Sequence, residues 1–448
     1  MNGNQDAREV REIALRIGVF FDGTGNNRSN APGRCEATAE EDGIAVTRLS
    51  NVAKLFDRYP GTIGPLPDGT SLVYLRRYVD GIATHPGSED SSYGWYTGLG
   101  DWGVHERVRQ ASAGLMLQLA AMARQEKVRV RAMTFDLFGF SRGAAAARDF
   151  ANDLHQAGKS QLAALAGGSS EIFVEGFSWE QDMDVHFIGL FDTVAAIIDP
   201  LHGDFSPTNA QNGGLRLGLS PGVAAQVVQL VAGDEWRVNF PLVRSPNDIV
   251  LPGCHADLGG GYPLRMRERS YLSKPYISQV ESDTPAEDTE AYASAGALLA
   301  ARYPDCPGYA PTVKVTQEAG CFGGKIVRAQ LYREREVFGH LSRVYLEVMH
   351  ALALAHGVPA GEREADEDCD RLPDELLPIS AKLMAFALGK QPTLGLTDEE
   401  RHLLQARYVH ASANWNPAVG VVADLLPGDL LYFNRPAEGA RGVLDNQD

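Results

Sequence analysis

The chain has 448 residues, of which 44% are hydrophobic and 22% are charged. These ordinary globular values exclude disorder, a collagen-like structure and a coiled coil as descriptions of the whole chain. The 58 acidic residues outnumber the 41 basic ones and give a formal charge of −17. Because phosphate binding needs a basic surface, we expect no nucleic acid as a partner.

The cysteines and the N-terminus bear on metal sites and on the compartment. The chain has five cysteines, with no C-x-x-C motif and no Cys/His cluster. We therefore expect no metal, no cofactor and no disulfide framework. Residues 1–16 mix charges and lack an apolar core, which argues against a secretory signal peptide. No apolar run is long enough for a membrane-spanning helix, so we expect a cytoplasmic protein in the cell that makes it.

Strand-like and helix-like segments alternate in the first part of the chain. Residues 13–21 (IALRIGVFF) predict a buried strand, and a second strand is predicted at residues 72–79. Residues 104–127 have helical periodicity. The strongest strand signal, at residues 128–140 (VRVRAMTFDLFGF), is followed by an Ala-rich helix at residues 142–156.

Two further strands, at residues 184–191 and 248–254, complete this pattern. Strands that alternate with helices predict an α/β fold, with a mostly parallel sheet and helices on both faces. The pattern thins after about residue 263, apart from apolar helices predicted at residues 341–356 and 376–388.

Two acidic stretches interrupt this later part of the chain. They lie at residues 281–290 (ESDTPAEDTE) and 362–375 (EREADEDCDRLPDE). We expect the first to be an exposed loop and the second to be a linker or the edge of a lid.

The central functional signal is a G-x-S-x-G motif at residues 139–143 (GFSRG), between the strongest strand and the following helix. On such a sharp turn Ser141 is strained, and a side chain at either glycine position would clash with the neighbouring strand or helix. Ser141 is then presented as a nucleophile, while the N–H of Arg142 points at a developing oxyanion. The alternative is a glycine-tight turn in which the serine only caps the helix.

A nucleophilic serine needs a base and an orienting acid, which follow in the order Ser, acid, His in this kind of fold. Asp192 ends an apolar strand, at the sheet edge where Ser141 also lies. His255 follows the next predicted strand and precedes three glycines at residues 259–261, a pattern that indicates a loop close to a reacting centre. We therefore assign Asp192 as the acid and His255 as the base. A helix cap and a structural histidine are the respective alternatives.

Two other residues compete for these roles. Asp257 is a rival acid because it lies two residues after His255. His410 is a rival base near the end of the chain, but it lacks the bordering glycines. A histidine in an ordinary hydrogen-bonded turn is the alternative for His410.

The loop at residues 22–25 (DGTG) allows three interpretations. The N–H groups of Gly23 and Thr24 can help to hold an oxyanion, as the loop after an early strand does in α/β-hydrolases. A glycine loop can also cradle a phosphate. The third interpretation is the start of an aspartate-nucleophile phosphatase motif, but Phe20 occupies the position of the nucleophile.

Four separated motifs occur in order at residues 21–26 (FDGTGN), 139–144 (GFSRGA), 191–194 (FDTV) and 252–262 (PGCHADLGGGY). Together they resemble the catalytic domain of the type VI secretion phospholipase effectors, family one. The resemblance implies an α/β-hydrolase fold, a Ser–Asp–His triad and phospholipase A activity on the membrane phospholipids of a rival bacterium. It also implies delivery into the periplasm of that target, an immunity protein and a secretion-tip (VgrG-like) protein as partners.

These observations lead to one functional prediction with two alternatives. We expect an α/β-hydrolase-like catalytic domain at residues 13–360 and a C-terminal extension, a candidate cap or lid, at residues 361–448. The predicted function is that of a serine lipid hydrolase, an antibacterial effector of the phospholipase A type. The alternatives are a soluble carboxylester or thioester hydrolase with the same triad, and a non-catalytic binding protein that kept the fold.

Overall fold

The structure is a computed structural model, and it describes residues 10–26, 49–62, 66–67, 69–82, 103–167, 171–195, 214–304, 309–320, 323–361, 371–417 and 432–446. Residues 362–370 of the predicted acidic linker lie outside this part of the chain. Of the five cysteines only Cys254 is described, and it is a buried free thiol.

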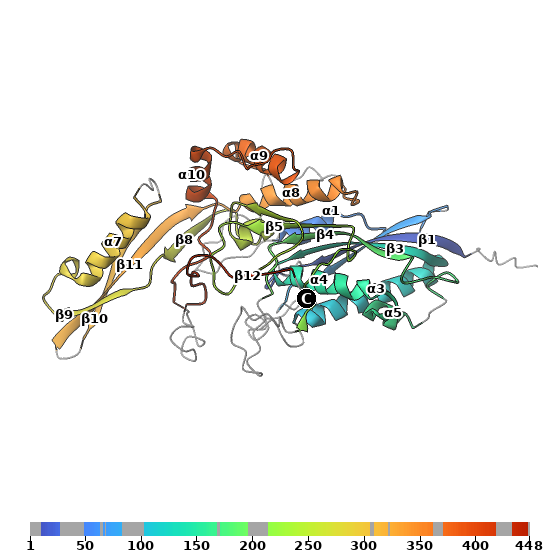
Figure 1. The fold of residues 1–448 in the computed structure, drawn as a ribbon, viewed down its shortest axis with the longest axis horizontal. Coiled ribbons are helices and arrows are strands. Elements are labelled where there is room, and N and C mark those ends of the chain that lie inside the picture. Colours follow the sequence, from blue (N-terminus) through green and yellow to red (C-terminus); the bar gives the residue numbers. More distant parts are fainter. Residues whose placement is uncertain are drawn as a thin grey trace, which may run out of the picture.

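A six-stranded parallel sheet runs through the main body of the molecule, in the order β2-β1-β3-β4-β5-β7 (Figure 1). Its strands are β1 (Arg11–Phe21), β2 (Leu72–Val79), β3 (Val128–Phe140), β4 (Met183–Phe191), β5 (Gln226–Ala232) and β7 (Asp248–Leu251). The sequence predicts all of these strands except β5. The last one ends earlier than expected, at Leu251, shortly before Gly253 adopts a φ of +119°.

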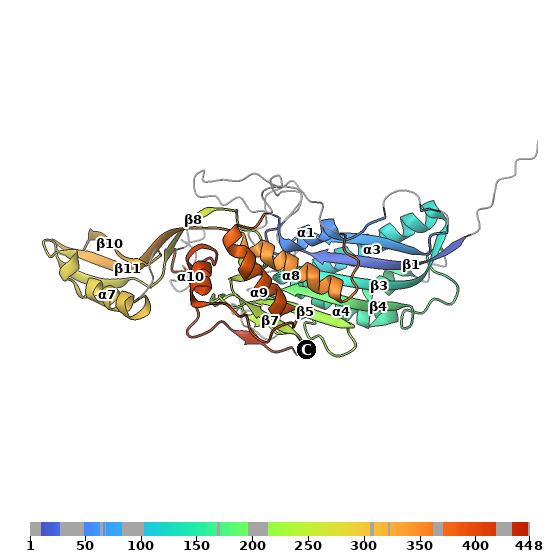
Figure 2. The same ribbon diagram turned by 90° about the horizontal axis from the view of Figure 1, so that it is seen from above.

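Helices cover both faces of this sheet, which confirms the predicted α/β architecture (Figures 1 and 2). One face carries α3 (Val104–Glu126), α4 (Arg142–His155) and α5 (Gln161–Ala166). The other carries α1 (Asn51–Arg58), α8 (Leu341–Ala355) and α9 (Leu377–Ala387), with α10 (Asp398–Arg407) beside α9. Each face has its own apolar core, because successive side chains of a strand point to opposite faces.

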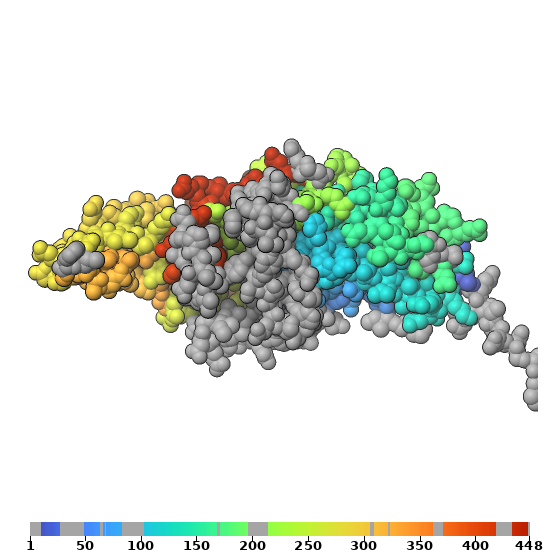
Figure 3. All heavy atoms as spheres, turned by 90° about the horizontal axis from the view of Figure 1, so that it is seen from below, coloured from blue at the N-terminus to red at the C-terminus, as the bar shows by residue number. Residues whose placement is uncertain are grey.

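A second, antiparallel sheet forms an arm that projects from one end of the molecule (Figures 1, 2 and 3). It consists of β8 (Met266–Tyr271), β9 (Tyr276–Glu281), β10 (Thr312–Ala319), β11 (Gly324–Val337) and the helix α7 (Glu290–Arg302). The exposed loop predicted at residues 281–290 corresponds to the connection between β9 and α7, which contains a 3-10 turn (Ala286–Asp288). The arm is hard to recognise in the sequence because its strands expose polar residues on much of their surface.

The C-terminal segment returns to the main body. Its short strand β12 (Val443–Leu444) pairs in parallel with β6 (Leu242–Val243). Within the described part of the chain, no helix combines the length and the apolar character that a bilayer crossing requires.

Candidate active site

Ser141 occupies the sharp turn between β3 and α4. Its backbone has φ +59° and ψ −128°, a conformation that side-chain-bearing residues rarely adopt. The turn is held in place by the N–H of Ser141, which donates to the carbonyl oxygen of Phe191 at 3.0 Å. This is the strained strand-to-helix turn on which a nucleophilic serine is presented.

The two glycines of the motif allow the chain to pass through this turn. A Cβ at Gly139 would lie 2.5 Å from the Cα of Ala144, on the helix that follows. A Cβ at Gly143 would lie 2.3 Å from the carbonyl oxygen of Asp22, at the end of β1. Both positions therefore require glycine for the steric reason expected from the motif.

Asp192 and His255 form a buried pair at the carboxyl edge of the sheet. Asp192 directly follows β4, and His255 opens the short helix α6 (His255–Gly259) where the sequence predicts a loop. The Nδ1 atom of His255 lies 2.6 Å from Oδ2 of Asp192. The rings of Phe140 and Phe240 pack against the imidazole, with centroids at 4.7 and 4.9 Å, so the ring has little room to turn.

Ser141 lies close to the Asp192–His255 pair. Phe140, which packs on the imidazole of His255, directly precedes Ser141, and Phe191, which accepts the N–H of Ser141, directly precedes Asp192. No hydrogen bond joins the Ser141 hydroxyl to the His255 ring, although both residues are described. The structure thus joins the predicted acid to the predicted base and brings the predicted nucleophile alongside. Such serine–histidine contacts often tighten only when substrate binds.

Arg441 binds the carboxylate of Asp192 and was not identified from the sequence. Its Nη2 and Nη1 atoms lie 2.6 Å from Oδ1 and 2.9 Å from Oδ2 of Asp192. Burial would by itself raise the pKa of Asp192, but the charge of Arg441 and the hydrogen bonds from Arg441 and His255 lower it below its ordinary value. Asp192 is therefore a carboxylate at neutral pH.

A second ion pair lies on the other side of His255. Glu235 accepts two hydrogen bonds from the guanidinium of Arg237, at 2.9 and 2.8 Å, and one from the backbone N–H of His255 at 3.2 Å. Burial opposes ionisation of Glu235, but Arg237 outweighs it and lowers the pKa of Glu235 to about 2. The pKa of His255 is lowered, chiefly by burial and against the effect of Asp192, which favours the neutral ring that a general base needs.

The loop after β1 carries the predicted oxyanion donors Gly23 and Thr24. The N–H of Gly23 donates to Oδ1 of Asp22 at 2.6 Å, so in this structure it is committed to that carboxylate. The Oγ1 of Thr24 accepts a hydrogen bond from Nε of Arg142 at 2.7 Å, which ties this loop to the start of α4. The oxyanion role predicted for Gly23 would therefore require its N–H to give up the contact with Asp22, whereas no such contact with a described residue is recorded for the N–H of Thr24.

The rival residues Asp257 and His410 form a pair of their own. The Nδ1 of His410 lies 2.6 Å from Oδ1 of Asp257, and the imidazole stacks on the ring of Tyr262 at 3.8 Å. The Nε2 of His410 is buried without a hydrogen-bond partner. The structure therefore does not join either rival to the Asp192–His255 pair.

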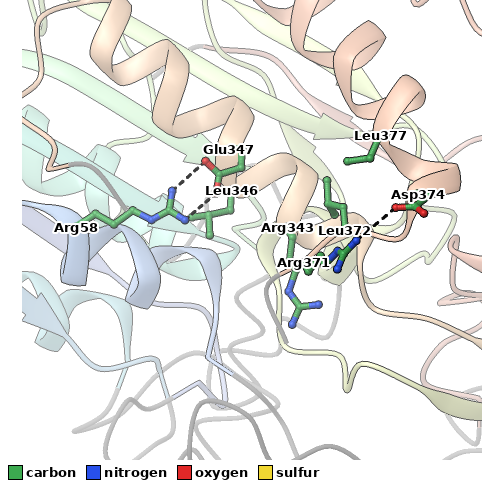
Figure 4. Close-up of a pocket in the computed structure, with 8 residues that line it drawn as sticks. All are labelled: Arg58, Arg343, Leu346, Glu347, Arg371, Leu372, Asp374 and Leu377. Atoms are coloured by element: carbon green, nitrogen blue, oxygen red, sulfur yellow. Dashed lines mark hydrogen bonds and ion pairs between the residues drawn. The ribbon is translucent and has the colours of Figure 1, made fainter. Parts of the chain in front are cut away.

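One hollow of about 290 Å³ lies between α8 and residues 371–377 (Figure 4). Its walls combine leucines with guanidinium groups, of which that of Arg58 is paired with Glu347 at 2.7 Å. No candidate catalytic residue lines it. Among the described residues, no group of three or more His, Cys, Asp or Glu side chains has an arrangement that could hold a metal ion.

Comparison with known proteins gives a strong similarity to a solved structure. No protein-family model matches the chain, and no curated protein matches its sequence significantly. A solved structure described as the Tle1 effector bound to the VgrG spike from the Type 6 secretion system is similar over 98% of this chain and 94% of that chain, with 28% identity and a TM-score of 0.76. An uncharacterised protein from Pseudomonas aeruginosa aligns over 89% of this chain and 53% of that chain, with 18% identity and a TM-score of 0.42.

The first of these similarities extends over nearly the whole of both chains. It agrees with the family resemblance carried by the four sequence motifs and with the six-stranded parallel sheet. The chain is therefore similar in structure to the Tle1 effector, and its fold is that of an α/β-hydrolase.

Proposed function

We propose that this protein is a serine hydrolase of the phospholipase A type that cleaves acyl esters of membrane glycerophospholipids. The observation that carries this proposal is the buried Asp192–His255 pair, at 2.6 Å, beside the strained turn that presents Ser141. The family resemblance supplies the substrate class, because the geometry of the triad alone is common to many ester hydrolases.

In the proposed reaction the Oγ of Ser141 attacks the ester carbonyl, and the Nε2 of His255 takes the hydroxyl proton. The tetrahedral intermediate places its negative charge near the N–H groups of Thr24 and Arg142. As the intermediate collapses, His255 returns the proton to the leaving lysophospholipid alcohol. Water, activated by His255, then attacks the acyl-enzyme, and the fatty acid is released as Ser141 recovers its proton.

Asp192 has a positioning and electrostatic role in this scheme. It holds the Nδ1–H of His255, which leaves Nε2 as the unprotonated nitrogen that can accept the proton of Ser141. Its negative charge also stabilises the imidazolium that forms during attack. The lowered pKa of Asp192 keeps this charge present throughout the neutral range.

We also propose that the protein is an antibacterial effector delivered by a type VI secretion system. The similar structure contains a Tle1 effector bound to a VgrG spike, which supports a spike protein of that kind as a partner. A dedicated immunity protein is expected from the family resemblance. Expression of the protein in the periplasm of a sensitive bacterium should be toxic, whereas the Ser141→Ala variant should be harmless there.

The activity is tested with Ser141→Ala on vesicles of phosphatidylethanolamine and phosphatidylglycerol. Release of fatty acid by the variant should fall by about 10⁴-fold or more. Ser178→Ala is a matched control, because the Ser178 hydroxyl bonds only to Glu180 on the surface. Undiminished release by Ser141→Ala would contradict the assignment. Activity on a short-chain ester without activity on vesicles would instead favour the soluble esterase.

A further inference from the structure

We propose that Arg441, in the C-terminal segment, is a positioning residue of the catalytic centre that fixes the carboxylate of Asp192 for its contact with His255. This inference rests on the proposed function, since it gives a role to a residue that does not itself touch the substrate. Arg441 lies in residues 361–448, the predicted extension, outside the segment expected to hold the catalytic domain.

The contacts of Asp192 define the orientation of its carboxylate completely. Oδ1 accepts hydrogen bonds from the N–H of Ala232 at 2.9 Å and from Nη2 of Arg441 at 2.6 Å. Oδ2 accepts from Nη1 of Arg441 at 2.9 Å and from Nδ1 of His255 at 2.6 Å. A two-pronged guanidinium contact of this kind fixes the plane of a carboxylate as well as its position.

The burial of this pair makes the contact strong. Asp192 is 0% exposed and Arg441 is 8% exposed, so little water competes for their hydrogen bonds. A buried carboxylate that loses its cation becomes costly to keep in place. Without Arg441, we expect the carboxylate of Asp192 to lose its fixed orientation, which would weaken the hydrogen bond that orients the ring of His255.

Backbone hydrogen bonds hold the main chain that follows Arg441 in position. The N–H of Leu242 donates to the carbonyl oxygen of Gly442 at 2.9 Å, and the N–H of Arg244 donates to that of Leu444 at 2.9 Å. Further along, Oδ1 of Asn446 accepts a hydrogen bond from Nη2 of Arg148, on the helix that begins directly after Ser141. The C-terminal segment is therefore fixed against both the acid and the nucleophile side of the site.

The charges around His255 suggest a second consequence of this arrangement. The charged groups that act on it are the carboxylates of Asp192 and Glu235 and the guanidinium of Arg237, while Arg441 offsets the charge of Asp192 from the far side of that carboxylate. Removing the charge of Arg441 leaves an excess of negative charge, which favours the imidazolium form of His255. The pH at which the base loses its activity should then move upward.

The experiment compares full-length Arg441→Met and Arg441→Lys with the wild-type protein, using a soluble nitrophenyl ester over a range of pH. For Arg441→Met we expect kcat to fall by about 10²-fold with little change in KM, because small displacements of a catalytic group have effects of this size. The acid limb of the pH profile should move up by about one pH unit. Arg441→Lys keeps the charge, so its acid limb should stay near that of the wild type and part of kcat should return.

Glu438→Gln is the control, since it removes a charge from an exposed position of the same segment. It should leave kcat and the pH profile unchanged. Wild-type kcat and pH profile in Arg441→Met would overturn the positioning role. Equal losses in the Met and Lys variants, with no movement of the acid limb, would also overturn it and indicate a purely structural contact.

The same measurements separate this inference from the proposed function. A wild-type protein that hydrolyses no ester, with Ser141→Ala behaving identically, would overturn the proposed function and the role of Arg441 together. An active wild-type protein that needs Ser141 but tolerates Arg441→Met would overturn the role of Arg441 alone.

Discussion

In the part of the chain that the structure describes, two buried histidine–aspartate pairs have nearly the same geometry. In each pair, Nδ1 of the histidine lies 2.6 Å from an aspartate oxygen, for Asp192–His255 and for Asp257–His410. What differs is the surroundings. The first pair adjoins the strained turn of Ser141 and is held by two arginine–carboxylate contacts, whereas in the second the imidazole stacks on Tyr262.

This difference teaches that a histidine–aspartate hydrogen bond is weak evidence for catalysis by itself. Asp257 also accepts the backbone N–H groups of Cys254 at 2.9 Å and His410 at 3.1 Å, as expected of a residue that fastens a late segment of the chain to α6. Asp192 has partners that instead fix its direction toward His255. The variants below test whether the Asp192–His255 pair serves catalysis and the Asp257–His410 pair serves stability.

We expect the largest difference in kcat when the aspartate of each pair is changed to asparagine. Asp192→Asn should lower kcat by about 10⁴-fold, because an amide favours the wrong tautomer of the histidine. Asp257→Asn, the matched variant of the other pair, should lower kcat by less than about tenfold. Steady-state kinetics on a soluble ester measures both, and similar losses in the two variants would erase the distinction.

The next largest loss of activity is expected from a change in the turn of Ser141, which lies beside the Asp192–His255 pair only. Gly143→Ala places a Cβ only 2.3 Å from the carbonyl oxygen of Asp22, so the turn and the loop after β1 must move apart. We expect kcat to fall by about 10²–10³-fold, the usual loss when an oxyanion donor is displaced. Gly296→Ala, where a Cβ would meet nothing within 4 Å, is the control and should keep full activity. An active Gly143→Ala enzyme would mean that the turn does not present the nucleophile.

The second pair should show its role in stability. His410→Gln removes an imidazole that is stacked and hydrogen-bonded in the interior, so the free energy of unfolding should fall by about 1–3 kcal/mol. Chemical denaturation of the variant measures this value, and kcat at a temperature well below the transition should change little. A variant that is as stable as the wild type but inactive would assign His410 to catalysis.

The last effect is confined to a narrow pH range and concerns Asp22, beside the candidate oxyanion loop. Burial raises its pKa to about 6, against hydrogen bonds from Ser50, Tyr78 and Gly23 that lower it. A carboxyl whose pKa is higher in the folded state binds more protons there, so its contribution to stability falls as the pH rises from about 4 to about 6. The difference in unfolding free energy between wild type and Asp22→Asn should change by up to about 3 kcal/mol over this range. A pH-independent difference would contradict the raised pKa.

Much of the fold was predictable because the central sheet is buried on both faces. The strands at residues 72–79 and 128–140 match the observed β2 and β3, since β-branched and aromatic residues fill them and each ends at a clear turn signal, Asp80–Gly81 for the first and the G-x-S-x-G motif for the second. The arm formed by β8 to β11 was missed because its half-exposed strands give only a weak alternation. β5 was missed as well, although five of its seven residues are buried.

The site was predictable where the residue type and the local backbone carry the signal. Ser141 lies in a short motif with steric requirements, and Asp192 and His255 each follow a predicted strand. Arg441 and Glu235 have no such signal, because their roles depend on which distant segments the fold brings together. The pairing of Asp257 with His410, two residues 153 positions apart, could not be read from the sequence for the same reason.

The most direct test of the central claim is labelling with a fluorophosphonate, followed by mass spectrometry of the modified peptide. The account predicts that the adduct forms on Ser141 in the wild-type protein, that the labelling rate falls by about 10²-fold or more in His255→Gln, and that it is nearly unchanged in His410→Gln. An adduct on another residue, or a rate that depends on His410 rather than on His255, would contradict it.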